Sequence, residues 1–188
     1  TDEERVQNMP FLFPGDPNKR WVVTEKIDGT STTFTMKGKG RKREFYICSR
    51  NVNFDKPEKA ERCYYETNVY LEMAEKYQVE GVLSEILAIK WKELDFVTLQ
   101  GETYGAGVQK RDYGLDGHDF MAFNLIFGYK DGTTRRFNPY EMRELLQEEY
   151  SPTFEISGSY LVSLAETLSL LMGSERTPEK DLIHRGVV

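Results

Sequence analysis

The sequence predicts an α+β domain in which helices pack outside a mostly antiparallel sheet. Short runs alternate apolar and polar residues between turn residues, as over 21–27, 31–37 and 119–129, and such runs are typical of strands. A longer segment, 58–78, places apolar residues at helical spacing among charged ones, and 160–172 is rich in leucine. Because strands joined by short turns pair antiparallel and helices bury one face, these segments favour one sheet with helices packed on it.

The first part of the chain is expected to contain an irregular segment followed by three strands. Residues 1–20 are polar and rich in turn residues. We expect strands at 21–27 and 31–37, joined at Asp28-Gly29, because Asp-Gly is a favoured two-residue hairpin turn. A third strand is expected at 44–50, which again alternates apolar and polar residues.

The rest of the chain is expected to alternate helices and strands. In chain order, the patterns predict a helix at 58–78, an apolar helix or strand at 81–90, a strand at 95–101 that leads to Glu102, a buried strand at 119–129, a short strand at 133–137, a helix at 139–149 that Pro139 opens, and a helix at 160–172.

Composition limits the classes of protein to consider. The 188 residues, of which 39% are hydrophobic and 13% aromatic, suffice for one folded domain. No apolar run approaches the roughly 18–20 residues that cross a membrane, so we expect no membrane partner. Cys48 and Cys63 have no metal-site spacing and fit a reducing compartment, which predicts a cytoplasmic location. His118 and His184 are isolated, and we expect structural or surface roles for both.

The charge distribution leaves two interpretations open. The net charge is −6, whereas nucleic-acid-binding proteins usually present a basic surface. Five cations nevertheless lie within residues 37–43, which connect two expected strands. This basic cluster is either a solvated hairpin tip or a loop that contacts phosphate groups.

A lysine before the Asp-Gly turn is the first candidate for chemistry. Residues 25–31 read Glu-Lys-Ile-Asp-Gly-Thr-Ser. An expected strand end holds Lys26 in place, and a lysine amine becomes a nucleophile when it loses its proton. The four residues from Lys26 to Gly29 alone are more typical of a surface hairpin, so the interpretation depends on the segments that follow.

Three later segments favour the chemical interpretation. Residues 45–51 read Phe-Tyr-Ile-Cys-Ser-Arg-Asn, residues 99–110 read Leu-Gln-Gly-Glu-Thr-Tyr-Gly-Ala-Gly-Val-Gln-Lys, and residues 117–126 read Gly-His-Asp-Phe-Met-Ala-Phe-Asn-Leu-Ile. With residues 25–31, this ordered set resembles the nucleotidyltransferase domain of ATP-dependent polynucleotide ligases, an ATP-grasp-like ligase fold. It looks most like the RNA ligase 2-like branch, which includes phage RNA ligases and RNA-editing ligases. The resemblance is clear over about 20–130.

The resemblance implies a three-step reaction with ATP and Mg²⁺ or Mn²⁺. A lysine attacks the α-phosphate of ATP, releases pyrophosphate and forms lysyl-AMP. The AMP then passes to a 5′-phosphate end, and a 3′-hydroxyl displaces it to seal the strand. The implied partners are RNA ends, with DNA ends left open, and the oligomeric state is not predicted.

The resemblance also implies roles around the nucleotide. Lys26 stands at the nucleophile position, Glu25 and Ile27 lie in the adenine pocket region, and Asp28 lies near the phosphates and a metal ion. Arg50 suits a ribose or phosphate contact because its planar fork binds oxyanions in pairs.

The later segments supply the remaining candidates. Glu102 matches a carboxylate that contacts the ribose hydroxyls, and Phe123 matches the aromatic ring that stacks on adenine. Phe120 lies three residues earlier, on the opposite strand face, and is expected in the core. Lys110 and Arg111 either contact substrate phosphate or belong to a solvated loop.

The resemblance fades toward the C-terminus. The family continues with a Glu-Gly strand and two lysines that bind the α-phosphate, whereas here Arg185 occupies the glutamate position and no lysine pair follows. We therefore expect residues 1–188 to form one nucleotidyltransferase domain that is truncated before the last motif. Without those cations, self-adenylylation of this chain should be severely impaired.

Three alternatives remain at this point. A DNA ligase and an mRNA-capping guanylyltransferase share the motif from Lys26 to Gly29. A non-catalytic protein that binds ATP or RNA ends would explain Arg185. The glycine-rich segment around Glu102 favours an RNA ligase.

Overall fold

The computed structural model describes residues 20–24, 26–54, 61–90, 92–146, 155–156 and 159–163. The chain forms two compact units. The larger unit comprises Asp28–Ile156, and the smaller one combines Thr1–Ile27 with Ser157–Val188.

The smaller unit is built on a two-stranded ladder. Strand β1 (Arg20–Thr24) pairs antiparallel with β8 (Ser159–Ser163), in a register that runs from Arg20↔Ser163 to Thr24↔Ser159. The helix predicted at 160–172 is therefore wrong over 160–163, and its remainder lies outside the described residues. The helical pattern was misleading because the Tyr-Leu-Val run of β8 also suits a strand once the Trp-Val-Val run of β1 pairs with it.

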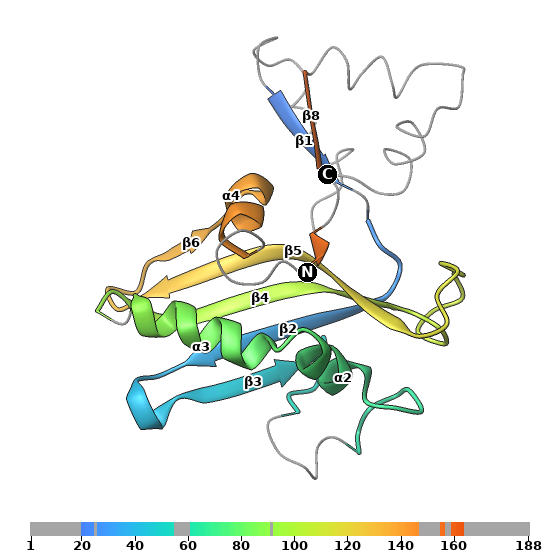
Figure 1. The fold of residues 1–188 in the computed structure, drawn as a ribbon, viewed down its shortest axis with the longest axis horizontal. Helices are drawn as coiled ribbons and strands as arrows, with labels where there is room; N and C mark the ends of the chain where they lie inside the picture. Colours follow the sequence, from blue (N-terminus) through green and yellow to red (C-terminus); the bar gives the residue numbers. More distant parts are fainter. Residues whose placement is uncertain are drawn as a thin grey trace. The chain divides into compact units, whose positions relative to one another are not determined.

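The larger unit contains a six-stranded sheet (Figure 1). Its strands follow the order β3-β2-β4-β5-β6, and β7 pairs with β5 off this path. Only the β5–β7 pairing is parallel among the described ladders, so the expected mostly antiparallel sheet is confirmed. The strands are β2 (Thr30–Lys37), β3 (Glu44–Cys48), β4 (Leu94–Gly105), β5 (His118–Tyr129), β6 (Thr134–Arg136) and β7 (Glu155–Ile156).

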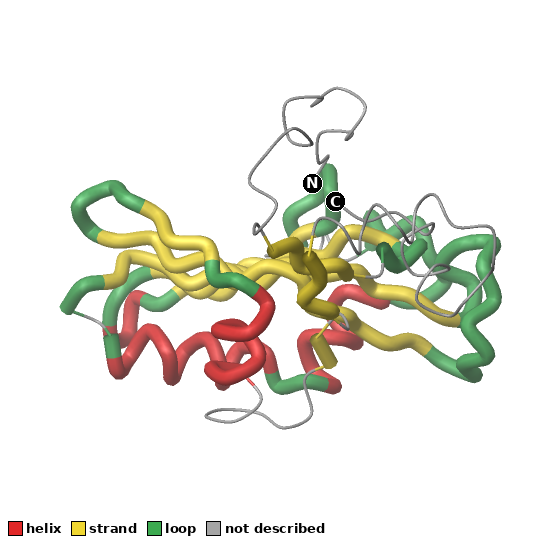
Figure 2. The backbone as a smooth tube through the Cα atoms, turned by 90° about the horizontal axis from the view of Figure 1, so that it is seen from above, coloured by secondary structure: helices red, strands yellow, loops and turns green. Residues whose placement is uncertain are grey.

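Within the described part of the chain, three α-helices pack on one face of this sheet, as Figure 2 shows from above. They are α2 (Val69–Lys76), α3 (Val79–Ile89) and α4 (Pro139–Arg143). Their apolar side chains share one core with the sheet residues beneath them. This arrangement confirms the predicted α+β fold class, and no described helix is long and apolar enough to cross a membrane.

The core lies between the helices and alternate residues of the long strands. Phe34, Leu99, Phe120 and Leu125 are fully buried there. The rings of Phe34 and Phe120 meet edge to face, with centroids 5.3 Å apart. The prediction that Phe120 belongs to the core is confirmed.

The Asp28-Gly29 turn does not close the predicted hairpin. Strand β2 pairs with β3 and β4, whereas β1 pairs with β8. The prediction is wrong because a turn signal reports only local backbone preference, while strand partners depend on long-range pairing. Here β2 pairs with β4 along its whole length, from Thr30↔Thr103 to Lys37↔Phe96.

The predicted helix at 58–78 begins only at Val69, and residues 61–67 form turns instead. Asn68 caps the helix, because its side-chain oxygen accepts a hydrogen bond from the backbone N–H of Leu71 at 3.2 Å. The ambiguous segment 81–90 is helical, within α3. Residues 55–60 lie outside the described part of the chain.

Strand lengths also differ from the prediction where the candidate residues lie. Strand β4 continues to Gly105, so Glu102 lies within the strand and not after it. Strand β3 ends at Cys48, so Arg50 follows the strand in a bend. The predicted helix at 139–149 opens at Pro139 as expected, behind a capping box formed by Asn138 and Glu141.

Candidate functional site

The sheet face opposite the helices carries polar side chains in register. Ser31 of β2 lies beside Glu102 of β4, which in turn lies beside Met121 of β5. One step along, Thr33 pairs with Gln100 in the same way. These side chains are partly buried, so the face combines hydrogen-bonding groups with restricted access to water.

Phe123 lies at a β-bulge on this polar face. Gln100 pairs with Asn124 and Gly101 pairs with Ala122, which leaves Phe123 as the extra residue of β5. The side chain of Ala122 is in the core on one side, and partly buried Phe123 points to the other. A bulge redirects a side chain locally, and bulges are common beside active sites.

Glu102 and Phe123 are therefore neighbours on one sheet face. Glu102 lies opposite Met121, two residues before Phe123 on β5. Side chains in such a diagonal position lie about 7–8 Å apart at Cβ, within reach of one bound ligand. The structure brings these two predicted residues together, as a shared nucleotide would require.

The Asp28-Gly29 turn packs directly against the end of β4 that carries Glu102. A Cβ atom on Gly29 would lie 2.2 Å from the carbonyl oxygen of Thr103 and 2.9 Å from Cγ of Glu102. Only a glycine allows the backbone to approach the strand so closely. The turn that follows Lys26-Ile27 is thus in contact with the polar face.

Two side chains from the loop after β4 hold this turn. Gln109 donates a hydrogen bond from Nε2 to the carbonyl oxygen of Gly29 at 3.1 Å. The backbone N–H of Asp28 donates to the hydroxyl of Tyr113 at 2.7 Å. Two backbone groups of the turn are therefore satisfied by the loop, and the turn is restrained relative to β4.

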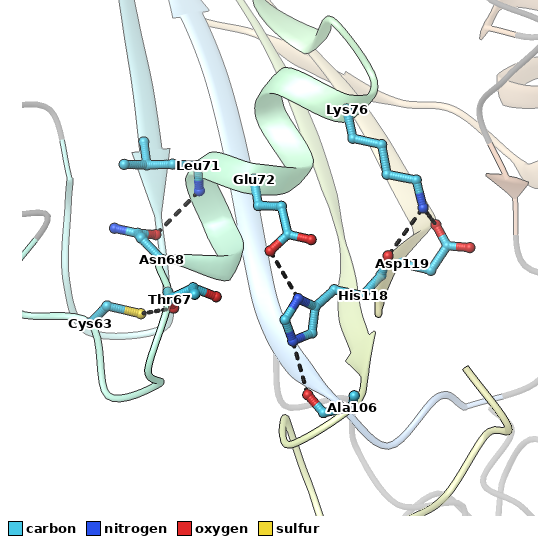
Figure 3. A network of polar contacts seen from close by, with 9 residues as sticks. All are labelled: Cys63, Thr67, Asn68, Leu71, Glu72, Lys76, Ala106, His118 and Asp119. Carbon is cyan, nitrogen blue, oxygen red and sulfur yellow. Dashed lines mark hydrogen bonds and ion pairs between the residues drawn. The ribbon is translucent and has the colours of Figure 1, made fainter. Parts of the chain in front are cut away.

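The loop that supplies this pair is itself anchored. Gly105 has a φ of +122°, and a Cβ there would lie 2.2 Å from the carbonyl oxygen of Gly117. His118 donates from Nε2 to the carbonyl oxygen of Ala106 at 2.9 Å, and its Nδ1 lies 2.9 Å from Oε2 of Glu72 on α2 (Figure 3). The structural role expected for His118 is confirmed.

Helix α2 is joined to the start of β5 by a second group of polar contacts (Figure 3). Lys76 Nζ lies 2.9 Å from Oδ1 of Asp119. The same carboxylate accepts hydrogen bonds from the hydroxyl of Tyr77 and from the backbone N–H of Phe120. Burial alone would raise the pKa of Asp119, but these donors together lower the pKa below its ordinary value of 3.8.

Lys110 and Arg111 lie in the same loop. The guanidinium of Arg111 lies over the ring of Tyr113, 5.3 Å from its centroid, and the side chain of Lys110 is exposed. The hydroxyl of Tyr113 also accepts a hydrogen bond from the backbone N–H of Asp28. Tyr113 therefore contacts both Arg111 and the turn. The structure therefore keeps Arg111 as a candidate for phosphate contact.

The nucleophile candidate directly precedes the anchored turn. The side chain of Lys26 is exposed, and that of Ile27 is buried. Both residues belong to the smaller unit. Glu25 and Arg185 lie outside the described residues.

Arg50 lines a cavity of about 250 Å³ at the end of β3. The same cavity is lined by Arg62, by Thr30 and by three tyrosines, Tyr64, Tyr65 and Tyr70. Two cations beside several aromatic rings suit a ligand that combines negative charge with a planar ring.

The basic cluster at 37–43 forms the tip of the β2–β3 hairpin. Lys37 lies 3.5 Å from a carboxylate oxygen of Asp95, and Arg43 donates to the hydroxyl oxygen of Ser84 at 2.8 Å. Between them, Gly40–Lys42 form an exposed turn of 3₁₀-helix. These contacts assign part of the cluster to fold stability.

The described residues offer little for a dedicated metal site. No group of three or more histidine, cysteine or acidic side chains lies together in the described ranges. Asp28 presents an exposed carboxylate beside the turn. Such a donor set fits Mg²⁺ or Mn²⁺ that arrives with nucleotide phosphates, because Mg²⁺ commonly takes one or two carboxylates and completes its shell with phosphates and water.

Sequence reasoning missed two residues of the site, Gln109 and Tyr113. Gln109 lies in the glycine-rich segment 99–110 that indicated a ligase. That segment did not predict the hydrogen bond from Gln109 to Gly29. Tyr113 lies outside every quoted segment, and its contact with Asp28 spans 85 positions of the chain. Only the folded loop reveals that contact.

These features define an α+β domain of the nucleotidyltransferase type, with a lysine ahead of a turn fixed against its sheet. The sequence model of the RNA ligase family matches residues 19–183. The chain belongs to the RNA ligase family.

Solved structures of Naegleria gruberi RNA ligase share the fold. A mutant solved with ATP and Mn aligns at a TM-score of 0.68 with 22% identity, over 97% of this chain and 49% of that one. The enzyme with PPi aligns at 0.67 with 23% identity, over 97% and 49%. An apo mutant aligns at 0.63 with 21% identity, over 90% and 46%. The chain thus spans about half the length of these structures, and no curated protein matches it significantly.

Proposed function

We propose that this chain is the adenylyltransferase domain of an ATP-dependent RNA ligase. Nζ of Lys26 attacks the α-phosphorus of ATP, a P–N bond forms, and the bond to the β-phosphate breaks as pyrophosphate leaves. The AMP then moves to a 5′-phosphate end, and a 3′-hydroxyl displaces it. Family membership supports the reaction class, and RNA is the favoured strand for the same reason.

The anchored turn is the observation that carries this proposal. A nucleophile must be held in a narrow range of positions to attack efficiently. Lys26 is separated from Asp28 by one residue, and Asp28 and Gly29 are tied to the loop by Tyr113 and Gln109. These two hydrogen bonds hold Asp28 and Gly29, which follow Lys26 and Ile27 in the chain, next to β4.

The polar face supplies the proposed nucleotide contacts. Glu102 accepts hydrogen bonds from ribose hydroxyls, and Phe123 stacks on adenine. The family resemblance assigns Glu25 and Ile27 to the adenine pocket, and Arg50 to ribose or a terminal phosphate. Neighbours solved with ATP and Mn support ATP as the nucleotide.

The proposal assigns a divalent ion one protein ligand and a role in neutralising phosphate charge. Asp28 would contribute one ligand to Mg²⁺ or Mn²⁺ bound with ATP. The ion neutralises phosphate charge when it is bound. Phosphate contacts from Lys110 and Arg111 would add to this neutralisation.

Covalent labelling tests the proposal. The chain is incubated with α-labelled ATP and Mg²⁺ under single-turnover conditions, and label that is stable to alkali but labile to acid, as a P–N bond requires, is followed on the protein. Lys26→Ala should remove the label, whereas Lys90→Ala, an exposed lysine at the end of α3, should retain it. Undiminished label on Lys26→Ala would disprove the assignment.

The same assay separates the alternative functions. Competition by GTP would favour a capping-type enzyme, and equal transfer of AMP to DNA ends would favour a DNA ligase. ATP binding without any covalent label would favour a non-catalytic binding protein. The need for ATP and the two cysteines, Cys48 and Cys63, which form no disulfide, support action in the reducing cytoplasm.

A further inference from the structure

The cavity at the end of β3 lies next to the anchored turn. Thr30, which forms part of its wall, directly follows Gly29. Ser49 and Arg50 line the cavity from the segment after β3. Because consecutive Cα atoms are about 3.8 Å apart, the cavity wall begins one residue from the turn.

Four aromatic rings lead from the core to the mouth of this cavity. Phe54 stacks on Tyr70 at 5.0 Å, Tyr70 meets Tyr65 at 6.3 Å, and Tyr65 meets Tyr64 edge to face at 5.5 Å. Phe54 and Tyr70 are 5% and 4% exposed, whereas Tyr64 is 93% exposed. The series thus ends in a ring with a free face, supported from behind by buried rings.

The charge at the cavity is positive. The side chains of Arg50 and Arg62 line it, and both residues are exposed. The hydroxyl of Tyr70 is hydrogen-bonded to Oγ1 of Thr30 at 2.8 Å, and burial raises the pKa of Tyr70 above its ordinary value of 10.0. Tyr70 therefore remains a neutral phenol, and it adds no negative charge to oppose the arginines.

We infer that this cavity binds the terminal nucleotide of an RNA strand, with its 5′-phosphate at Arg50 and Arg62 and its base on Tyr64. The inference depends on the proposed function, because a ligase must hold the end that receives AMP. Exposed aromatic rings stack on the unpaired bases of single strands, and arginine binds phosphate through paired N–H groups.

The size of the cavity favours a nucleotide end over ATP. At about 250 Å³ it is smaller than the roughly 300–1,000 Å³ typical of pockets that enclose a whole small-molecule ligand. One phosphate and part of one sugar or base fit this volume. The rest of an RNA strand would extend from the open side past Tyr64.

Equilibrium binding of RNA tests the inference. Fluorescence anisotropy measures the affinity of the 188-residue chain for a short single-stranded RNA that carries either a 5′-phosphate or a 5′-hydroxyl, in Mg²⁺ without ATP. Wild type should prefer the phosphorylated end. Arg62→Met should abolish that preference, and Tyr64→Ala should weaken both RNAs by roughly fivefold or more.

Two controls make the result specific. Lys90→Met removes one positive charge from α3 and should leave both affinities unchanged. Covalent labelling with ATP alone should also be unchanged in Arg62→Met and Tyr64→Ala. Circular dichroism checks that both exposed substitutions leave the fold intact.

Each remaining outcome has a defined meaning. Equal RNA affinity in wild type and both variants would overturn the inference. Weaker ATP labelling with unchanged RNA affinity would overturn it as well and assign the cavity to ATP. Label on Lys26→Ala equal to that on wild type would instead refute the proposed function, whereas the RNA measurements would still report on the cavity.

Discussion

Gly29 experiences a steric constraint that its neighbours in the motif do not. Its α-carbon lies so close to β4 that an added Cβ would meet Thr103 and Glu102. The conformational freedom of an Asp-Gly turn is therefore only part of the reason for a glycine at this position. Close contact with the strand that carries Glu102 is the other part.

Gly29→Ala should lower stability and slow labelling of Lys26 together. The clash involves backbone atoms that cannot move easily, and overpacking of this kind costs about 1–3 kcal/mol. Urea unfolding measures the first effect and single-turnover labelling the second. The matched control is Gly81→Ala in α3, where nothing lies within 4 Å of the added Cβ. It should raise the free energy of unfolding by about 0.5–1 kcal/mol, and the same response from both variants would contradict the packing argument.

Phe123 is the second residue whose position determines its role. Phe123→Ala should weaken ATP binding by about 1–3 kcal/mol, the worth of stacking on a base. Phe123→Leu should be milder because it retains apolar contact. Calorimetry in the Lys26→Ala background measures binding without turnover.

Ile126→Ala provides the control for Phe123. Ile126 lies on the same face of β5 and is also partly buried, but it is beyond the bulge and pairs with Thr98. ATP affinity should be unchanged in this variant. An equal loss from Phe123→Ala and Ile126→Ala would indicate general loosening of the sheet.

At the scale of elements, α2 is attached to β5 by polar contacts as well as by apolar packing. The carboxylate of Asp119 accepts hydrogen bonds from Lys76 and Tyr77 of this helix and its C-cap. Its lowered pKa means that folding favours the ionised form. This contribution to stability is complete above the ordinary value of 3.8 and is lost as pH falls through the lower, folded-state pKa.

Asp119→Asn should therefore destabilise the protein in a pH-dependent way. At neutral pH we expect a loss of about 1–3 kcal/mol, because hydrogen bonds to a charged group are removed. The difference from wild type should shrink as pH falls below 3.8. Urea unfolding across this range measures it, with exposed Asp116→Asn as the control. A difference that is constant with pH would show that the ionised carboxylate is not the stabilising group.

At the scale of the whole molecule, the proposed function requires a negatively charged chain to bind a negatively charged nucleotide. The net charge is −6, and the described residues contain no cluster of metal ligands. Divalent ions should therefore be held mainly by the phosphates of bound ATP, with Asp28 as a minor ligand.

Metal removal checks this expectation. EDTA should abolish labelling of Lys26, and Mg²⁺ or Mn²⁺ should restore it. In equilibrium dialysis without ATP, the chain should retain no stoichiometric Mn²⁺ under conditions in which the ATP-bound chain does. Tight Mn²⁺ binding to the ATP-free chain would reveal a protein site that the described residues do not form.

Patterns in the sequence were sufficient for the features that depend on neighbouring residues. Alternation predicted β5 and the core position of Phe120, and Pro139 predicted the start of α4, because side-chain direction and helix capping are local properties. The chemical motif around Lys26 was equally visible, since the order of residues along the chain carries it. The helix predicted at 58–78 was partly wrong, because the apolar residues keep helical spacing through residues that form turns before Asn68.

Tertiary structure alone decided the features that depend on distant partners. The choice of β4 and β8 as partners for β2 and β1 could not follow from a local turn signal. The register of β4 with β5 that places Phe123 near Glu102, the hydrogen bonds from Gln109 and Tyr113, and the cavity of Arg50 and Arg62 arise only when remote segments meet. A sequence specifies which groups are present and how they alternate, whereas pairing register and packing determine which groups share a site, because those depend on the combined free energy of the whole fold.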